Sequence, residues 1–419
     1  MENREYDVVV IGGGPAGMAA ALSARALGCG VALLERDDEL GGILNQCIHN
    51  GFGLQYFKEE LTGPEYADRF IKQVSSERID TYLQTMVMEI DAGRRITAVN
   101  RQGVLHIGAG AVVLAMGCRE RSRGAIMIPG YRPAGIMTAG IAQRYMNVEN
   151  LRPGSRAVIL GSGDIGLIMA RRMHLEGIEV VGVYELLPYV TGLPRNVKQC
   201  LDDFDIPLRL STTVIEILGK NRLTGVVVAG VDQQMQPIAG TESRIDCDTL
   251  LLSVGLIPEN DLSVKAGIAL NQATNGPLVD NRLQTNAPGI FACGNVLHVH
   301  DLADNVTLEA QRAGAQAANF ARGAGPADGE ARMHKLLPGA NVRYTVPNYL
   351  PQRINEKIGV FFRVSRPITD GCLQITHRGE AIFRSRPASY RPGIMNKIAL
   401  TGKMIAHLED DLFLSVEEA

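Results

Sequence analysis

The stretch YDVVVIGGGPAGMAAALSARALGCGVALLE, from Tyr6 to Glu35, decides the fold of this 419-residue chain. It opens with a β-branched apolar run that is typical of a central parallel strand covered on both faces. Three glycines with GxGxxG spacing follow, namely Gly12, Gly14 and Gly17. They allow a tight turn, a close approach of a pyrophosphate and close packing of the next helix, whose N-terminus attracts phosphate. A second apolar strand ends at Glu35, where a carboxylate can accept hydrogen bonds from a ribose 2′-OH. The stretch therefore predicts a dinucleotide-binding unit.

A second strand–glycine–helix unit repeats this pattern farther along the chain. The apolar strand at residues 156–160 leads into Gly-Ser-Gly-Asp-Ile-Gly at residues 161–166, and the following strand ends at Glu185. An acid at that place repels the 2′-phosphate of NADP. The repeat therefore predicts a second nucleotide site, which prefers NAD(H).

Length and charge narrow the class of protein. A chain of 419 residues suggests two or three domains. A net charge of −3 gives no electrostatic footprint for nucleic acid or an anionic membrane. No apolar run is long enough for a transmembrane helix, and the chain enters its first strand without a signal peptide. We expect a cytoplasmic protein whose seven scattered cysteines are free thiols.

Glycine turns outside the two units carry a family resemblance. Gly41-Gly42 follow Glu35, Ala115-Met116-Gly117 end an apolar strand, and Ala292-Cys293-Gly294-Asn295 end another. Together they resemble the FAD-binding half of the two-dinucleotide-binding-domain flavoproteins, the group that contains glutathione reductase, thioredoxin reductase and NADH oxidase. The turn at Gly255 resembles the one that closes the NAD domain of that group.

The resemblance implies a set of contacts for each cofactor. FAD is expected at Gly12, Gly14, Pro15, Ala16, Gly17, Glu35, Arg36, Gly42, Val87, Ala115, Gly117, Gly294 and Asn295. NAD(H) is expected at Gly161, Gly163, Asp164, Ile165, Gly166, Glu185 and Gly255. Most relatives have an aspartate in place of Asn295, which hydrogen-bonds a ribityl hydroxyl of FAD; an amide can make the same bond.

The resemblance also implies an α/β fold with two Rossmann-like, three-layer ββα-type nucleotide-binding domains, the NAD domain being inserted in the FAD domain. We expect the FAD-binding domain at residues 1–122 and 276–325, and the NAD(H)-binding domain at residues 123–275. Alternation over residues 81–90 favours one strand. After a Gly/Ala/Pro linker, short strands separated by prolines predict a small β-rich domain at residues 331–419.

The C-terminal domain admits two interpretations, because so small a unit buries little apolar surface alone. It can offer a β edge or apolar patch to another subunit or to a second copy, or it can pack against its own nucleotide-binding domains. The first interpretation predicts that deleting residues 333–419 leaves FAD bound and abolishes association. Loss of FAD on deletion would favour the second.

The redox disulfides of the family are missing. Leu44 and His49 stand where glutathione reductase-like members carry their cysteine pair, and the segment 118–161 lacks the CxxC of thioredoxin reductases. Cys47 and His49 are the candidate catalytic residues, since single-cysteine relatives cycle one thiol through sulfenic acid near the flavin and an imidazole can relay a proton. The alternative is that Cys47 is a small apolar group packed beside a cofactor.

No metal site is expected. His298 and His300 alternate as at the end of a strand, and no carboxylate near them in sequence has the spacing of a metal ligand.

The segments Cys118–Arg121, Pro129-Gly130 and Gly135–Thr138 are most similar to the FAD/NAD-binding subunits of hydrogen cyanide synthase, opine oxidase and related dehydrogenase complexes. This resemblance implies an FAD-dependent oxidoreductase that takes hydride from NADH and exchanges electrons with a partner dehydrogenase subunit or another acceptor. A homo-oligomer, with or without the partner subunit, is also compatible with it. The alternative function is a self-contained NADH oxidase or peroxidase that uses Cys47.

Overall fold

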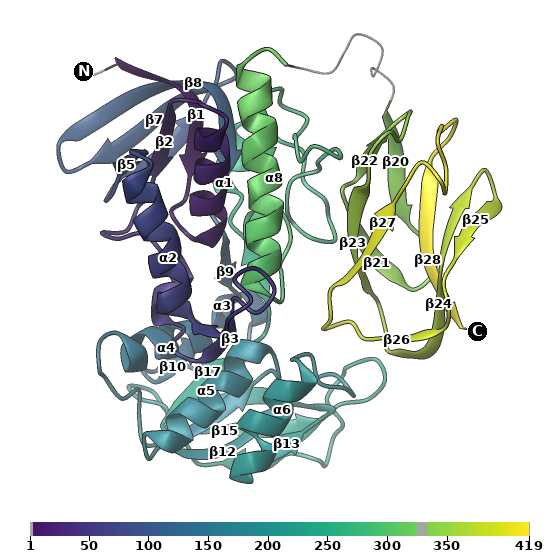
Figure 1. The fold of residues 1–419 in the computed structure, drawn as a ribbon. Coiled ribbons are helices and arrows are strands. Elements are labelled where there is room, and N and C mark those ends of the chain that lie inside the picture. Colours follow the sequence, from purple (N-terminus) through teal and green to yellow (C-terminus); the bar gives the residue numbers. More distant parts are fainter. Residues whose placement is uncertain (1–2, 325–332, 419) are drawn as a thin grey trace. The chain divides into compact units, whose positions relative to one another are not determined.

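The computed structural model describes residues 3–324 and 333–418. These residues form two compact units (Figure 1). The flanking unit combines Met1–Cys118 with Pro258–Ala419, and the inserted unit is Arg119–Ile257. Within the inserted unit, the Arg121 N–H donates to the Gly255 oxygen at 2.9 Å. The two ends of the inserted unit therefore lie next to each other.

The flanking unit is built on a sheet with the strand order β5-β2-β1-β8-β7-β6, and β19 pairs with β8. The strands are β1 Asn3–Ile11, β2 Val31–Leu34, β5 Asp80–Tyr82, β6 Met86–Ile90, β7 Arg95–Asn100, β8 Gly103–Leu114 and β19 Ile290–Ala292. Strands β1, β2, β5, β8 and β19 run parallel, whereas β6, β7 and β8 form an antiparallel meander. The predicted single strand at residues 81–90 is wrong: its two halves, β5 and β6, lie at opposite edges of the sheet.

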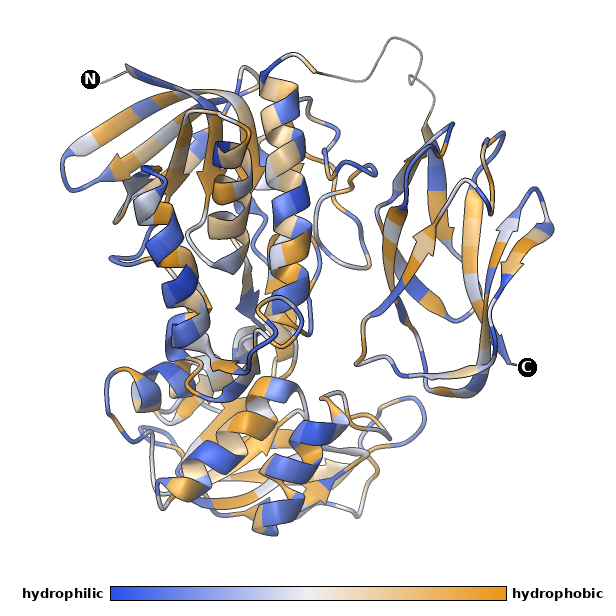
Figure 2. Ribbon diagram, viewed as in Figure 1, coloured by the Kyte–Doolittle hydropathy of each residue, from blue (hydrophilic) through white to orange (hydrophobic). Residues whose placement is uncertain are grey.

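Three helices pack with this sheet: α1 Pro15–Ala26, α2 Gly63–Ser76 and α8 Ala303–Ala321. The apolar run Val8–Val10 has no exposed surface, as its β-branched sequence predicts for a covered strand. Most of the central strands consist of hydrophobic residues, whereas α2 and α8 also carry hydrophilic residues (Figure 2). Helix α2 begins with a capping box, in which the Thr62 side chain accepts from the Glu65 N–H and Glu65 accepts from the Thr62 N–H.

The inserted unit repeats the strand–turn–helix pattern. Its parallel sheet has the order β10-β17-β11-β12-β13, with β10 Ile136–Thr138, β11 Arg156–Leu160, β12 Glu179–Tyr184, β13 Leu208–Arg209 and β17 Thr249–Leu252. Its helices include α4 Ala139–Asn147, α5 Asp164–Leu175 and α6 Pro194–Cys200. A second, antiparallel sheet consists of β14 Thr212–Leu218, β15 Gly225–Gly230 and β16 Ser243–Ile245.

Short elements connect these layers. They are η1 Gly42–Gln46, β3 Asn50–Phe52, β4 Leu61–Thr62, β9 Cys118–Glu120, α3 Arg123–Ile126, η2 Asp202–Phe204, β18 Leu256–Pro258, α7 Asp261–Lys265 and η3 Gly294–Val296. The turn that includes η3 follows β19 and leads toward α8.

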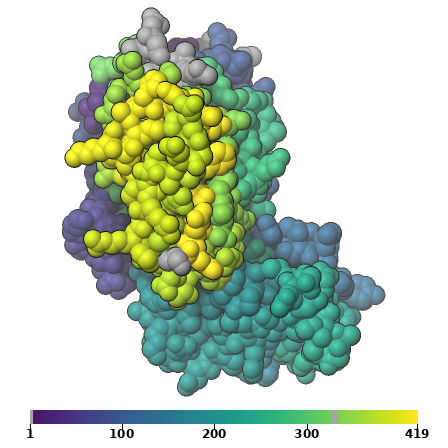
Figure 3. Space-filling model, turned by 90° about the vertical axis from the view of Figure 1, so that its right-hand side faces the viewer, coloured from purple at the N-terminus to yellow at the C-terminus, as the bar shows by residue number. Residues whose placement is uncertain are grey.

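The C-terminal β region, residues 333–418, confirms the prediction of a β-rich tail. Its strands are β20 Met333–Pro338, β21 Val342–Val346, β22 Tyr349–Pro351, β23 Ile358–Val364, β24 Ile368–His377, β25 Glu380–Arg384, β26 Ala388–Tyr390, β27 Asn396–Leu400 and β28 Leu412–Glu418. They form two sheets around a hydrophobic core of their own, and they make up the yellow and yellow-green surface in Figure 3.

Part of the C-terminal β region also packs on the rest of the flanking unit. Tyr344 and Val346 belong to the core that contains β1 and β8. The Asn348 side chain accepts from the Val279 N–H at 3.0 Å, and Arg363 is ion-paired with Asp301. The second interpretation of the tail, packing against its own chain, accounts for these contacts.

Candidate functional site

Four segments that are far apart in sequence meet at the first glycine turn. A Cβ atom built at Gly12 would lie 2.5 Å from the Ala115 oxygen, and one at Gly42 would lie 3.2 Å from the Gly14 Cα. A Cβ at Gly294 would lie 2.9 Å from the Ala16 Cβ. Side chains at these glycines would therefore collide with the neighbouring segments, and Gly12, Gly42 and Gly294 also have positive φ angles. The structure thus brings together most of the predicted FAD residues.

The same turn has room and polarity for a phosphate. Gly14 caps α1 without a side-chain hydrogen bond, and Pro15 follows it. A Cβ at Gly14 would meet no atom within 4 Å. The first N–H groups of the helix and its positive dipole end are thus available to an anion. The turn therefore offers the open space and the N–H groups that the predicted pyrophosphate would need.

Glu35 lies at the end of β2, as predicted, and is buried. One carboxylate oxygen accepts from the Gly13 N–H at 2.6 Å, and the other accepts from the Asp37 N–H at 2.8 Å. A carboxylate offers about four acceptor sites, so a ribose hydroxyl can still be accommodated. The next residue, Arg36, is exposed. Glu35 therefore braces the turn as well as marking the predicted ribose position.

The remaining predicted FAD residues are placed differently. Gly117 lies just beyond β8, and a Cβ there would meet no atom within 4 Å. Val87 is buried on β6, at the far edge of the sheet from β5. The Asn295 side chain already has partners in the chain, since its oxygen accepts from the His300 N–H at 3.0 Å and its nitrogen donates to the Cys118 sulfur at 3.6 Å.

The second glycine turn has the same construction. Gly161 lies against the Ser253 oxygen, where a Cβ would come within 2.2 Å. The Gly166 N–H donates to the Ser253 hydroxyl at 3.1 Å. The Glu185 carboxylate accepts from the Ser162 N–H at 2.8 Å and from the Leu187 N–H at 3.0 Å.

Asp164, Ile165 and Gly255 are also predicted to bind NAD(H), and they differ in their contacts. Asp164, at the start of α5, accepts from the Leu193 N–H at 2.8 Å and from Asn196 at 2.6 Å. Ile165 is half-buried. Gly255 has open space where a Cβ would stand. The sequence analysis did not identify Ser162 and Ser253, which hold the turn through their hydroxyls; position within the motif was the available signal for Ser162.

The candidate catalytic pair lies around η1. Cys47 is half-buried, and its thiol donates to the Ile43 oxygen at 3.2 Å. His49 is half-buried, bonds the Asn50 oxygen through Nδ1 at 3.0 Å and packs on Phe52, with ring centroids 5.1 Å apart. None of the seven cysteines, all of which lie within the described residues, forms a disulfide. A catalytic role for Cys47 and His49 stays a prediction.

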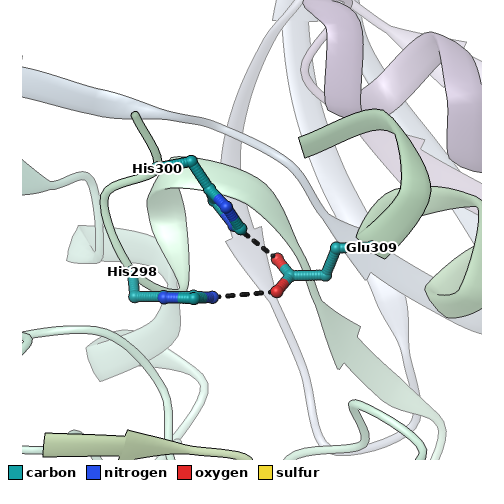
Figure 4. Close-up of side chains that lie close together, drawn as sticks. All are labelled: His298, His300 and Glu309. Atoms are coloured by element: carbon teal, nitrogen blue, oxygen red, sulfur yellow. Dashed lines mark hydrogen bonds and ion pairs between the residues drawn. The ribbon is translucent and has the colours of Figure 1, made fainter. Parts of the chain in front are cut away.

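The sequence did not reveal a buried cluster of His298, His300 and Glu309 next to Gly294. His298 and His300 each direct Nε2 at a different oxygen of Glu309, at 2.8 and 3.1 Å (Figure 4). The Gly294 N–H donates to the same carboxylate at 2.7 Å. No carboxylate near the histidines in sequence has the spacing of a metal ligand, but Glu309 reaches them in space from the second turn of α8. Only a three-dimensional contact reveals this; the local signal was an acid in an alanine-rich helix.

Burial sets the charge state of the cluster. The side chains of His298 and His300 are completely buried and that of Glu309 is 2% exposed. Burial lowers the pKa of His298 and so favours the neutral imidazole. For Glu309, burial raises the pKa, but the electrostatic and hydrogen-bonding contributions of the two histidines outweigh it and hold the pKa below its ordinary value. The Gly294 N–H and Nε2 of both histidines surround the two oxygens of Glu309, which is the environment of a carboxylate anion.

These features define a class of protein: an α/β flavoprotein-type oxidoreductase with two glycine turns, each braced by a buried acid. A profile of the pyridine nucleotide-disulphide oxidoreductase family matches residues 6–317, more than half of the chain. The chain therefore belongs to that family. It is an FAD- and NAD(P)-dependent oxidoreductase, because the family binds FAD and a pyridine nucleotide.

Curated relatives agree with this assignment. The HcnB subunit of hydrogen cyanide synthase from Pseudomonas protegens is 28% identical over 317 residues, which cover 69% of this chain and 65% of the relative. One subunit of the opine oxidase from Agrobacterium tumefaciens is 28% identical over 318 residues, 69% of this chain and 61% of the relative. The match thus spans less than two thirds of either relative. Both relatives are named as subunits, so homologues of this chain work in multi-subunit enzymes.

Solved structures share the fold. Thioredoxin reductase of T. acidophilum superposes with a TM-score of 0.62 at 24% identity, covering 77% of this chain and all of that one. Thioredoxin reductase of Lactococcus lactis gives 0.63 at 21% identity, covering 76% of this chain and 99% of that one. The described part of the chain has no helix with both the length and the apolarity needed to cross a membrane.

Proposed function

We propose that the protein oxidises NADH with FAD and transfers the electrons to a partner subunit without a redox disulfide. The observation that carries this proposal is the pair of glycine turns, each with its own buried acid, Glu35 and Glu185. One turn per nucleotide is what hydride transfer between a pyridine nucleotide and a flavin requires. The naming of the relatives as subunits supports the partner.

The flanking unit would hold FAD and the inserted unit would hold NAD(H). Bound FAD supplies the chemistry, since it accepts a hydride and passes electrons onward. The chain supplies phosphate binding at the start of α1, steric clearance at Gly12, Gly42 and Gly294, and a fixed carboxylate at Glu35. At the second turn, Glu185 would disfavour the 2′-phosphate of NADP by charge repulsion.

Anaerobic titration tests the proposal. The purified protein should be yellow with non-covalent FAD, and NADH should bleach the flavin absorbance without oxygen. A folded protein that stays colourless after incubation with FAD would refute the proposal. Purification of the native complex should then identify the partner, and reduction of the partner's redox group by NADH only when this chain is present would support electron transfer between subunits.

The second candidate is a self-contained NADH oxidase or peroxidase that uses Cys47. The observation that favours this candidate is the position of Cys47. Its thiol is half-buried, and it lies close in sequence to Gly42, which packs against the first glycine turn. If the flavin alone relays electrons, Cys47→Ser should keep NADH-driven dye reduction within a few-fold of wild type. A thiol-based oxidase would lose turnover of oxygen or peroxide in the same variant. Cys372→Ser, at a buried thiol of the C-terminal β region, is the matched control.

A further inference from the structure

The cluster of His298, His300 and Glu309 connects directly to the loop at which FAD is proposed to bind. Glu309 accepts the Gly294 N–H, and the His300 N–H donates to the Asn295 oxygen. Both residues of the Gly294-Asn295 turn are therefore held by members of the cluster. The hydrogen bonds to an anionic acceptor are the stronger kind.

The geometry is that of a hydrogen-bonded network. Two histidines and a carboxylate are also a donor set for metals. In this cluster, however, each Nε2 lies at hydrogen-bond distance from its own carboxylate oxygen. Metal-ligating histidines almost always donate the other ring N–H to an acceptor, whereas Nδ1 of His298 and of His300 has no partner among the described residues. Donation from Nε2 of each imidazole to its own carboxylate oxygen, which leaves Nδ1 as an acceptor without a partner, fits both observations.

The C-terminal β region seals this network. The Phe361 ring lies 5.5 Å from the His298 ring and 5.7 Å from the His300 ring, measured between centroids. Tyr344 packs edge-on against His298 at 6.1 Å. Arg363 donates to the Val299 oxygen between the two histidines at 3.1 Å and pairs with Asp301. Water is excluded from the carboxylate by side chains of the tail as well as by α8.

We propose that Glu309 is a positioning residue for the flavin: clamped by His298 and His300 under the cover of the C-terminal β region, it fixes the Gly294-Asn295 turn and places a permanent negative charge beside it. This inference rests on the proposed binding of FAD at that turn. It has two separable consequences. The hydrogen bonds from the cluster to Gly294 and Asn295 should hold the turn in the position that binds FAD. The negative charge of Glu309 should oppose reduction of the flavin, because added electrons are disfavoured near a buried anion.

The test compares Glu309→Gln with Glu309→Asp, reading the midpoint potential and the dissociation constant of bound FAD. Glu309→Gln removes the charge, so the potential should shift to a more positive value. Glu309→Asp keeps the charge on a shorter side chain, so the potential should stay near that of wild type. FAD should bind about tenfold more weakly, which corresponds to about 1.4 kcal/mol, because the hydrogen bonds that hold the turn are lengthened or lost. Glu216→Gln, at an exposed position of the inserted unit, is the control and should change neither quantity.

Two further variants keep the test decisive if Glu309→Gln fails to fold. His300→Gln retains a side-chain N–H and should bind FAD better than His300→Ala. Phe361→Ala opens the cover and should also weaken FAD binding. Metal analysis of the wild-type protein completes the set: one tightly bound transition-metal ion per chain that is lost in Glu309→Gln would overturn the hydrogen-bonded network.

The outcomes separate the inference from the function on which it rests. Colourless wild-type protein refutes FAD binding itself. Yellow wild-type protein whose flavin potential is unchanged by Glu309→Gln overturns the role of the charge. Equal FAD affinity in wild type, Glu309→Asp and His300→Ala overturns the positioning role.

Discussion

The two glycine turns are built alike, and they differ at one position that changes what their acids do. Gly13 and Ser162 occupy the same place, and the N–H of each donates to the acid at the end of the next strand, at 2.6 and 2.8 Å. The Ser162 hydroxyl adds a 2.5 Å hydrogen bond to Glu185 and accepts from the Thr191 N–H at 3.0 Å. Gly13 has no such group.

Both turns are tied by a backbone hydrogen bond to the loop that follows the acid, but only the second turn adds a side-chain hydrogen bond to that loop. The Gly41 N–H donates to the Gly13 oxygen at 2.9 Å, and the Gly192 N–H donates to the Ser162 oxygen at 2.8 Å. A Cβ at Gly13 would lie 2.5 Å from Leu40 and 2.9 Å from Glu35, so the first turn has no space for a serine. The two units therefore share the glycine motif, and they differ in the hydrogen bonds that the Ser162 hydroxyl adds to the second turn.

The largest effect is expected from Gly17→Ala compared with Gly166→Ala. A Cβ at Gly17 would lie 1.7 Å from the Gly12 oxygen, a backbone atom, whereas the nearest atom at Gly166 is the Ser253 Cβ at 2.6 Å. Gly17→Ala should lose FAD and lower the free energy of unfolding by roughly 3 kcal/mol, and Gly166→Ala by about 1–2 kcal/mol. Flavin absorbance per chain and denaturant unfolding measure both. Comparable effects in the two variants would mean that the turns are equally tight.

An intermediate effect is expected from Glu185→Ser, which acts on the second turn alone. Removing the carboxylate relieves a repulsion of about 1 kcal/mol at 4 Å in water, so the ratio of kcat/KM for NADPH to that for NADH should rise roughly fivefold. FAD content should stay at the wild-type level. A wild-type enzyme that already prefers NADPH would contradict this interpretation of Glu185.

The smallest effect is expected from Ser162→Gly, which makes the second turn resemble the first. The variant loses the hydroxyl hydrogen bonds to Glu185 and Thr191, which should cost about 1–2 kcal/mol of stability. Limited proteolysis should cut the loop at residues 189–193 faster. Unchanged proteolysis would show that other contacts hold this loop, such as the one between Asp164 and Leu193.

The sequence predicted the turns well because their determinants are local. Glycine spacing, flanking apolar strands and a terminal acid all lie within about thirty residues, and each has one steric or electrostatic purpose. The positions of Gly12, Gly17, Gly161 and Glu185 in the structure follow from that logic.

The missed features depend on contacts between distant segments. Glu309 is brought to Gly294 by the packing of α8, and Phe361 reaches the histidines from another sheet. Residues 81–90 alternate like one strand, yet β5 and β6 join opposite edges of the sheet. Local periodicity carries no information about which partner a strand finds.

The hydrogen bond between Arg121 and Gly255 joins the two ends of the inserted unit. A segment whose ends are adjacent can be cut out and replaced by a short linker with little loss of chain entropy. Such a segment can equally be produced as a separate polypeptide, so the nucleotide specificity can be transferred together with the inserted unit. Exchanging Arg119–Ile257 for the matching segment of a relative would then change the electron donor while leaving the flavin environment as it is.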